Sequence, residues 1–154
     1  MRKSGPEKQV ELEIISWGSR NGFDLTVVDT SAVWNPMAGR YLSKQASESL
    51  PDMIGNYGGL SVWIELKAPG RRCVINSKSS QHQRAFLMRK IKQGCFAVVS
   101  DGEAHLRSIW DKYRQASQFE KPAVLIADLP VERITKLSVH QDTASKKLQS
   151  GPAK

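Results

Sequence analysis

Three charged side chains stand in or beside two segments that otherwise read as buried strands. They are Asp52, Glu65 and Lys67, within the run LPDMIGNYGGLSVWIELKAPG over residues 50–70. Because side chains alternate across a strand, Glu65 and Lys67 share one face, about 7 Å apart. A glycine pair between the segments predicts a hairpin that sets Asp52 across from Glu65. An E-x-K triplet alone is most often a surface salt bridge, so the second carboxylate is the informative feature.

Two carboxylates at one point repel each other, and each raises the pKa of the other unless a cation lies between them. Hard oxygen ligands favour Mg²⁺ or Mn²⁺, which keep several waters and can also bind phosphate oxygens. Such a metal polarises a phosphodiester and lowers the pKa of a bound water. Lys67, on the same face, would orient that water or offset charge in the transition state. The three residue types therefore predict metal-dependent phosphodiester hydrolysis.

The charge of the chain is +8 and is unevenly placed. From residue 67 to residue 92 there are eight basic residues and no Asp or Glu. A block of one sign indicates a polyanionic partner, and a solvated basic face is the alternative. Four basic residues beside the site are predicted to contact DNA through phosphates, which gives affinity without sequence information. These are Arg71, Arg72, Lys78 and Arg84.

The elements that must position these residues alternate between helices and strands. Amphipathic periodicity predicts helices over residues 7–21, 80–93 and 102–117. Apolar runs bounded by turn residues predict strands over 23–29, 51–57, 60–67 and 95–100. Residues 30–50 are predicted to form a long loop with a short helical turn, and 122–137 an edge strand and a short helix. The order α-β-β-β-α-β-α predicts a mixed sheet flanked by helices, in the α/β or α+β class.

The length of 154 residues suits one domain. We assign residues 7–138 to that domain, 1–6 to a flexible tail and 139–154 to a disordered basic tail. The longest apolar runs have five residues, far below the ~20 needed to cross a bilayer, and no secretory signal is visible. Two cysteines and three histidines are too scattered for a disulfide framework or a zinc site. A cytoplasmic protein without a membrane partner is expected.

Asp52 followed by Glu65-Leu66-Lys67 resembles the signature of the PD-(D/E)XK nucleases, in which it lies on the second and third strands of an αβββαβ core. Within that superfamily the chain resembles the VRR-NUC domains. There a small-residue loop follows the E-x-K strand, and the next helix opens with a glutamine and closes at a glycine. The run SQHQRAFLMRKIKQG over residues 80–94 is similar. The resemblance covers residues 7–110, except that 30–50 is longer than the minimal core requires.

The resemblance implies an α/β, restriction-endonuclease-like fold and assigns roles to residues of this chain. It implies that Mg²⁺ or Mn²⁺ is held by Asp52, Glu65, the Leu66 carbonyl and Glu11, and that the other catalytic residues are Lys67 and Gln83. Gln83 precedes Gly94 by eleven residues, the spacing that fits the family, and Gln81 is the alternative.

The resemblance also implies a metal-binding glutamate on the first predicted helix, and three glutamates there are candidates. At about 100° per residue, Glu11 falls inside the apolar arc of the helix, and Glu7 shares that arc one turn earlier. Glu13 falls on the polar side. Holliday-junction resolvases of the archaeal type, which this helix also resembles, place such a glutamate before a Gly-Phe pair, and Gly22-Phe23 favours Glu11.

The resemblance implies a structure-specific DNA endonuclease of repair or recombination, acting at Holliday junctions or other branched DNA. Symmetric cleavage of a junction needs two active sites, so a homodimer is expected. The implied setting is the cytoplasm or nucleoid of a bacterial or phage-infected cell. A flap, fork or general duplex nuclease of the same fold is one alternative. A non-catalytic DNA-binding module is another, and it predicts salt-sensitive binding without metal or cleavage.

Overall fold

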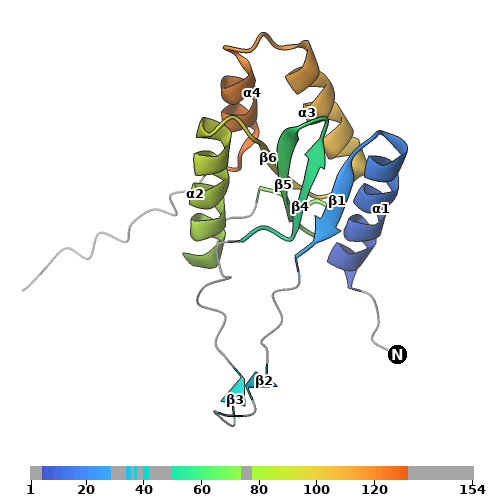
Figure 1. The fold of residues 1–154 in the computed structure, drawn as a ribbon, viewed down its shortest axis with the longest axis vertical. Coiled ribbons are helices and arrows are strands. Elements are labelled where there is room, and N and C mark those ends of the chain that lie inside the picture. The colour runs from blue at the N-terminus through green and yellow to red at the C-terminus, as the bar shows by residue number, and fades with distance from the viewer. Residues whose placement is uncertain are drawn as a thin grey trace, which may run out of the picture.

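A computed structural model describes residues 5–28, 34–35, 37, 40–41, 50–73 and 78–131, with the backbone alone at 34–35, 40–41 and 78–79. Four helices and four longer strands make up the body of the molecule, shown in Figure 1. In chain order they are α1 (Pro6–Arg20), β1 (Asp24–Val27), β4 (Met53–Tyr57), β5 (Leu60–Leu66), α2 (Lys78–Lys92), β6 (Phe96–Ser100), α3 (Glu103–Gln115) and α4 (Lys121–Asp128). Two further strands, β2 (Trp34–Asn35) and β3 (Arg40–Tyr41), pair as a small hairpin between β1 and β4.

The body is an α/β fold with a four-stranded mixed sheet in the order β1-β4-β5-β6. β1, β4 and β5 are antiparallel neighbours, and β6 runs parallel to β5 after the crossover through α2. The elements of this sheet and its helices follow the order α-β-β-β-α-β that the sequence predicts. The predicted fold class is confirmed.

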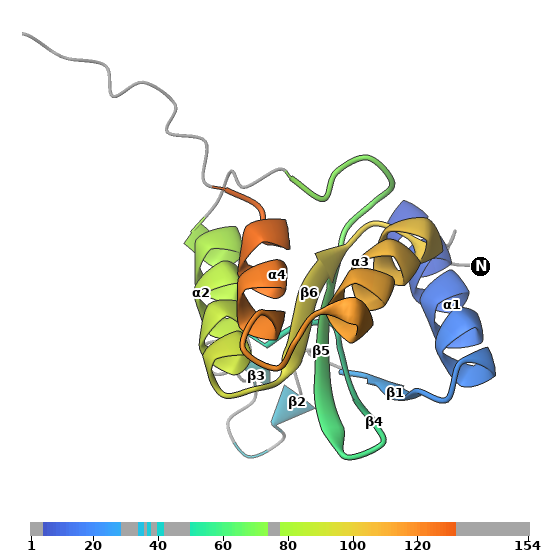
Figure 2. The same ribbon diagram turned by 90° about the horizontal axis from the view of Figure 1, so that it is seen from above.

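The sheet lies between two layers of helices, with α1 and α3 on one side and α2 and α4 on the other (Figure 2). β5 has two buried faces, because Val62, Ile64 and Leu66 enter the main core while Trp63 packs against Phe86 of α2. β6 is buried along its whole length, as its five-residue apolar run predicts for a parallel strand covered on both sides. Glu65 therefore points into the layer between the sheet and α2.

Local sequence signals explain the elements around the site. α1 begins at Pro6 and buries Val10, Ile14 and Trp17, which recur at helical spacing. The β4–β5 hairpin turns at Gly58 and Gly59, both with positive φ, as a two-residue hairpin requires. This turn fixes the register between the two strands that carry the carboxylates.

Two predicted segments differ from the structure. Within residues 30–50, the predicted loop with a helical turn contains the β2–β3 hairpin, and its remaining residues lie outside the described ranges. The edge strand predicted at the start of 122–137 is wrong, because that stretch belongs to helix α4. The apolar run AVLIA is too short for its period to distinguish the two, and Pro122 at the first turn favours the helix.

The predicted tail over 139–154 lies outside the described residues, and of the predicted tail over 1–6, Pro6 already belongs to α1. Across the ranges that the structure describes, no helix combines the length and apolar character needed to span a bilayer.

Candidate active site

Asp52 and Glu65 face each other across the β4–β5 hairpin. The register pairs Met53 with Ile64, so one step further along the strands Asp52 stands opposite Glu65. The Leu66 backbone N–H donates a hydrogen bond to Asp52 Oδ2 at 2.8 Å, which fixes this carboxylate against the end of β5. The predicted juxtaposition of the two acids is therefore present in the fold.

Glu65 is a buried carboxylate with one oxygen bonded and one left over. Only 2% of the residue is exposed. Lys67 Nζ donates to Glu65 Oε1 at 2.6 Å, while Oε2 is buried and has no hydrogen-bond partner among the described residues. Burial and the negative charge of Asp52 raise the pKa of Glu65 to about 7, although the Lys67 ammonium opposes them. A buried carboxylate with a free oxygen and a second carboxylate beside it is a site that a cation would stabilise.

A small cavity lies at this carboxylate. Its volume is about 10 Å³, room for about one water or one monatomic ion. Its lining includes Glu65 on β5, Lys67 directly after β5, and Gln83 in the second turn of α2. Gln81, the alternative, is exposed on the same helix. Gln83 thus lines the cavity at Glu65, and its catalytic role stays a prediction.

A larger groove of about 630 Å³ opens on the other side of Lys67. Its walls come from the start of α1, the loop after β5 and the start of α2, and include Glu7, Lys67 and Arg71. Lys67 lines both the groove and the small cavity, so the two spaces meet at this residue. A substrate in the groove could therefore contact Lys67.

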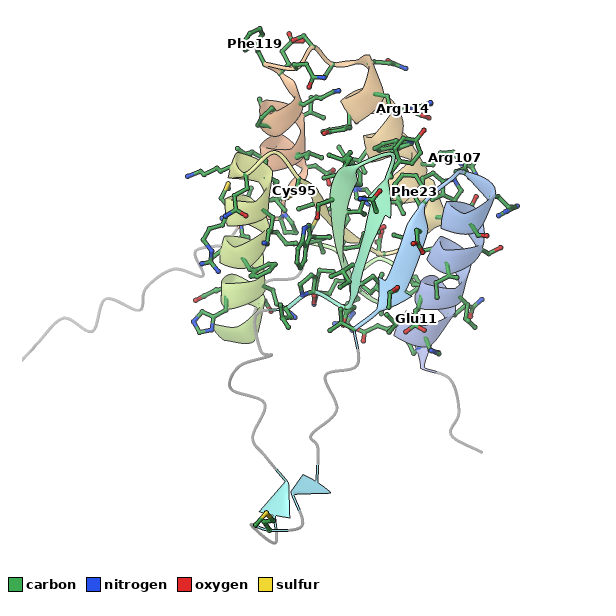
Figure 3. The ribbon with its side chains drawn as sticks, in the orientation of Figure 1. Glu11, Phe23, Cys95, Arg107, Arg114 and Phe119 are labelled. Carbon is green, nitrogen blue, oxygen red and sulfur yellow. The ribbon has the colours of Figure 1, made fainter. Side chains whose placement is uncertain are left out.

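Glu11, the acid expected from the first helix, does not form a metal-binding group with Asp52 and Glu65. Glu11 is half-buried in the N-terminal half of α1 and forms an ion pair with Lys8 on its own helix (Figure 3). Glu7 lines the groove next to Lys67, whereas Glu13 is exposed. No group of three His, Cys, Asp or Glu side chains in the described ranges is arranged to hold a metal ion. The roles predicted for Glu11 and for the Leu66 carbonyl stay predictions.

Two of the four basic residues predicted to contact DNA are tied to the end of α4. Arg72 Nη1 donates to the Asp128 carbonyl at 2.7 Å and lies 3.4 Å from its carboxylate, and Arg84 Nε donates to the Pro130 carbonyl at 2.7 Å. His105 Nε2 lies 3.1 Å from both carboxylate oxygens of Asp128. Both arginines also line the small cavity. The end of α4 thus closes the site on one side.

Sequence reasoning missed this contribution of α4, because its contacts join residues up to 56 positions apart and follow no local pattern. Of the other two basic residues, Arg71 is exposed at the groove, and the side chain of Lys78 lies outside the described residues.

The donor set fits a hard divalent cation. Two carboxylates, one of them with a buried free oxygen, are the ligand type that Mg²⁺ and Mn²⁺ prefer, and such ions keep waters in their remaining positions. Two protein carboxylates are enough where substrate phosphate completes the shell.

Comparison of the chain with protein-family models finds no match. Comparison with curated proteins also finds no relative.

Proposed function

We propose that the protein is a metal-dependent DNA endonuclease of the PD-(D/E)XK type, similar to VRR-NUC nucleases. The observation that carries the proposal is the buried Glu65 carboxylate, which has an unbonded oxygen, faces Asp52 and is bridged to Lys67. Burying such a carboxylate destabilises the folded protein, so its presence favours a functional role.

Each residue of the site has a chemical role in phosphodiester hydrolysis. Asp52 and Glu65 would hold Mg²⁺ or Mn²⁺, which supplies the positive charge that polarises the phosphodiester and acidifies a bound water. Lys67, between the cavity and the groove, orients the attacking water and offsets the charge that develops on the phosphate. Gln83 positions Lys67 or a phosphate oxygen through its amide.

The substrate class rests on charge and on the resemblance. The excess of basic residues between 67 and 92 suits a polyanion, and Arg71 lines the groove next to Lys67. Branched DNA, in particular a Holliday junction, and a homodimeric enzyme are what the resemblance adds. A flap, fork or duplex substrate would use the same site.

The test is cleavage by purified variants. Asp52→Ala and Lys67→Ala are incubated with a four-way junction, a flap, a fork and linear duplex, each with Mg²⁺ or Mn²⁺. The control is Asp111→Ala, which removes a carboxylate on α3 that pairs with Arg114 at the surface. We expect cleavage to fall by about 10²–10³-fold or more in both site variants and to persist in the control.

Cleavage at the wild-type rate by either site variant would refute the assignment. If the wild type binds DNA in a salt-sensitive manner and cuts none of the four substrates with either metal, only a DNA-binding module remains. Paired nicks placed symmetrically about the four-way junction would single out a resolvase.

A further inference from the structure

A second group of charged and aromatic side chains lies on the same side of the sheet as Glu65. Lys90 Nζ sits 4.3 Å from the centre of the Trp63 ring and 5.4 Å from that of Phe86. The two rings are 5.3 Å apart, and the Arg89 guanidinium is 5.6 Å from Phe86. Trp63 precedes Glu65 by two residues on β5, so the cluster starts about 7 Å from the candidate site. We call these four residues, Trp63, Phe86, Arg89 and Lys90, the α2 cluster.

Arg89 and Lys90 of the α2 cluster have no carboxylate partner among the described residues, unlike several cations on α1 and α3. On α1 and α3, Lys8 pairs with Glu11, Arg107 with Glu103, and Arg114 with Asp111. α2 contains no Asp or Glu, and within the described ranges neither Arg89 nor Lys90 forms an ion pair with a carboxylate. Among the described residues, no carboxylate therefore neutralises Arg89 or Lys90, and both charges can meet an anion.

The aromatic rings hold the Lys90 ammonium in place. A cation over a ring face is stabilised by the ring quadrupole, by about 0.5–1 kcal/mol at exposed sites. Lys90 is half-buried, so its rotamer freedom is already restricted before any ligand arrives. Next to it the sheet face is open, because Ile54, the cross-strand partner of Trp63, is 37% exposed.

We propose that the α2 cluster binds the phosphate backbone of the DNA strand that flanks the cleaved bond. The proposal rests on the proposed nuclease function and adds where the substrate runs. Lys90 is seven residues from Gln83, which is about 10 Å along a helix. For a duplex that runs parallel to α2, at 3.4 Å of axis per nucleotide, that distance corresponds to about three nucleotides. In that orientation the bound phosphate lies about three nucleotides from the bond at Lys67.

The contact carries no sequence information, because a backbone phosphate is the same at every base. A second copy of this chain is a poorer occupant, since pairing two such surfaces face to face would bring uncompensated cations together. A polyanion instead gains from them.

The experiment measures DNA binding without metal, so that cleavage plays no part. Fluorescein-labelled four-way junction and linear duplex are titrated in EDTA at several salt concentrations with wild type, Lys90→Ala and Arg89→Ala. Arg114→Ala is the matched control, because Arg114 also lies over an aromatic ring, at 5.9 Å from Trp110, but on α3 and paired with Asp111 (Figure 3). Thermal unfolding and sedimentation of each variant test whether the fold and the mass are retained.

We expect the slope of log K against log salt to become shallower by about 0.9 in each of Lys90→Ala and Arg89→Ala, with no change in Arg114→Ala. A neutral methylphosphonate about three nucleotides from the cleaved bond should weaken binding of the wild type and leave Lys90→Ala unaffected.

Slopes equal to wild type in both α2 variants would overturn the inference, as would an equal change in the control. A change in sedimenting mass with an unchanged slope would overturn it in favour of an interface between copies. The proposed function can fail separately, because it depends on cleavage by the Asp52 and Lys67 variants.

Discussion

Replacing Glu65 by Gln tests whether the buried carboxylate is the ionisable group that the site is built around. Gln is similar in size and remains neutral at every pH, so it removes the charge while keeping most of the packing. In metal-free buffer the free energy of unfolding of wild type should decrease with rising pH relative to Glu65→Gln. The variant is therefore expected to be the more stable protein at alkaline pH and to be inactive as a nuclease.

The sign and the size follow from the raised pKa. In the unfolded chain the carboxyl loses its proton near pH 4.5, whereas in the folded protein its pKa is raised to about 7 by burial and by Asp52. Between those values the folded state binds more protons than the unfolded state, so stability falls as pH rises and levels off above pH 7. The interval of about 2.5 pH units, at 1.36 kcal/mol per unit, amounts to roughly 3 kcal/mol.

The assay is denaturant unfolding of both proteins from pH 4.5 to 8.5 in EDTA, with the difference between their unfolding free energies plotted against pH. Titrating groups that do not interact with Glu65 are common to both proteins and cancel, so the difference reports Glu65 together with its partners Asp52 and Lys67. Glu103→Gln, which removes a carboxylate that pairs with Arg20 of α1 and with Arg107 on its own helix, controls for losing an acid elsewhere. Mn²⁺ should stabilise wild type above pH 7 by about 2.7 kcal/mol at a hundred times its dissociation constant, and should leave Glu65→Gln unchanged. A difference that stays constant with pH would refute the reasoning.

Two further outcomes are expected. Gln83→Ala should lower kcat because Gln83 lines the cavity at Glu65, whereas Gln81→Ala on the exposed side of α2 should not; equal rates of cleavage by the two variants would contradict that assignment. Asp128→Ala removes the acceptor of two part-buried donors and should cost about 1–3 kcal/mol of unfolding free energy, against less than about 0.5 kcal/mol for Asp111→Ala in an exposed pair. Thermal or denaturant unfolding measures the comparison, and equal losses would show that the α4 contacts add nothing.

The fold was predictable where the sequence contains turn residues or a clear apolar periodicity. The glycine pair at 58 and 59 fixes the hairpin, and the apolar periodicity of residues 10, 14 and 17 fixes the buried face of α1. The register of that hairpin then follows, and with it the position of Asp52 opposite Glu65. The AVLIA run misleads because five apolar residues suit a strand and a helix equally. Pro122 favours the helix, and packing against α2 and α3 decides for it.

The site was predictable to the extent that it lies on one hairpin and one adjacent helix. Contacts between distant segments left no sequence signal, which is why Asp128 and His105 were missed as partners at its edge. The same limit applies to the first helix. Helical angle alone favours Glu11, but angle does not report that Lys8 lies close enough to pair with it, nor that Glu7 reaches the groove.

The ammonium of Lys67 does not by itself balance the two carboxylates of the site. Lys67 lies 2.6 Å from Glu65, yet the pKa of Glu65 remains raised, so one cation does not offset both burial and Asp52. With both acids ionised, Asp52, Glu65 and Lys67 carry one net negative charge among the three of them. Adding a divalent cation changes that net charge to one positive, equal and opposite to the single charge of a phosphodiester. If the proposed function holds, a bound divalent ion would keep Glu65 ionised near neutral pH and add positive charge beside the phosphodiester, so metal binding and substrate binding should strengthen each other.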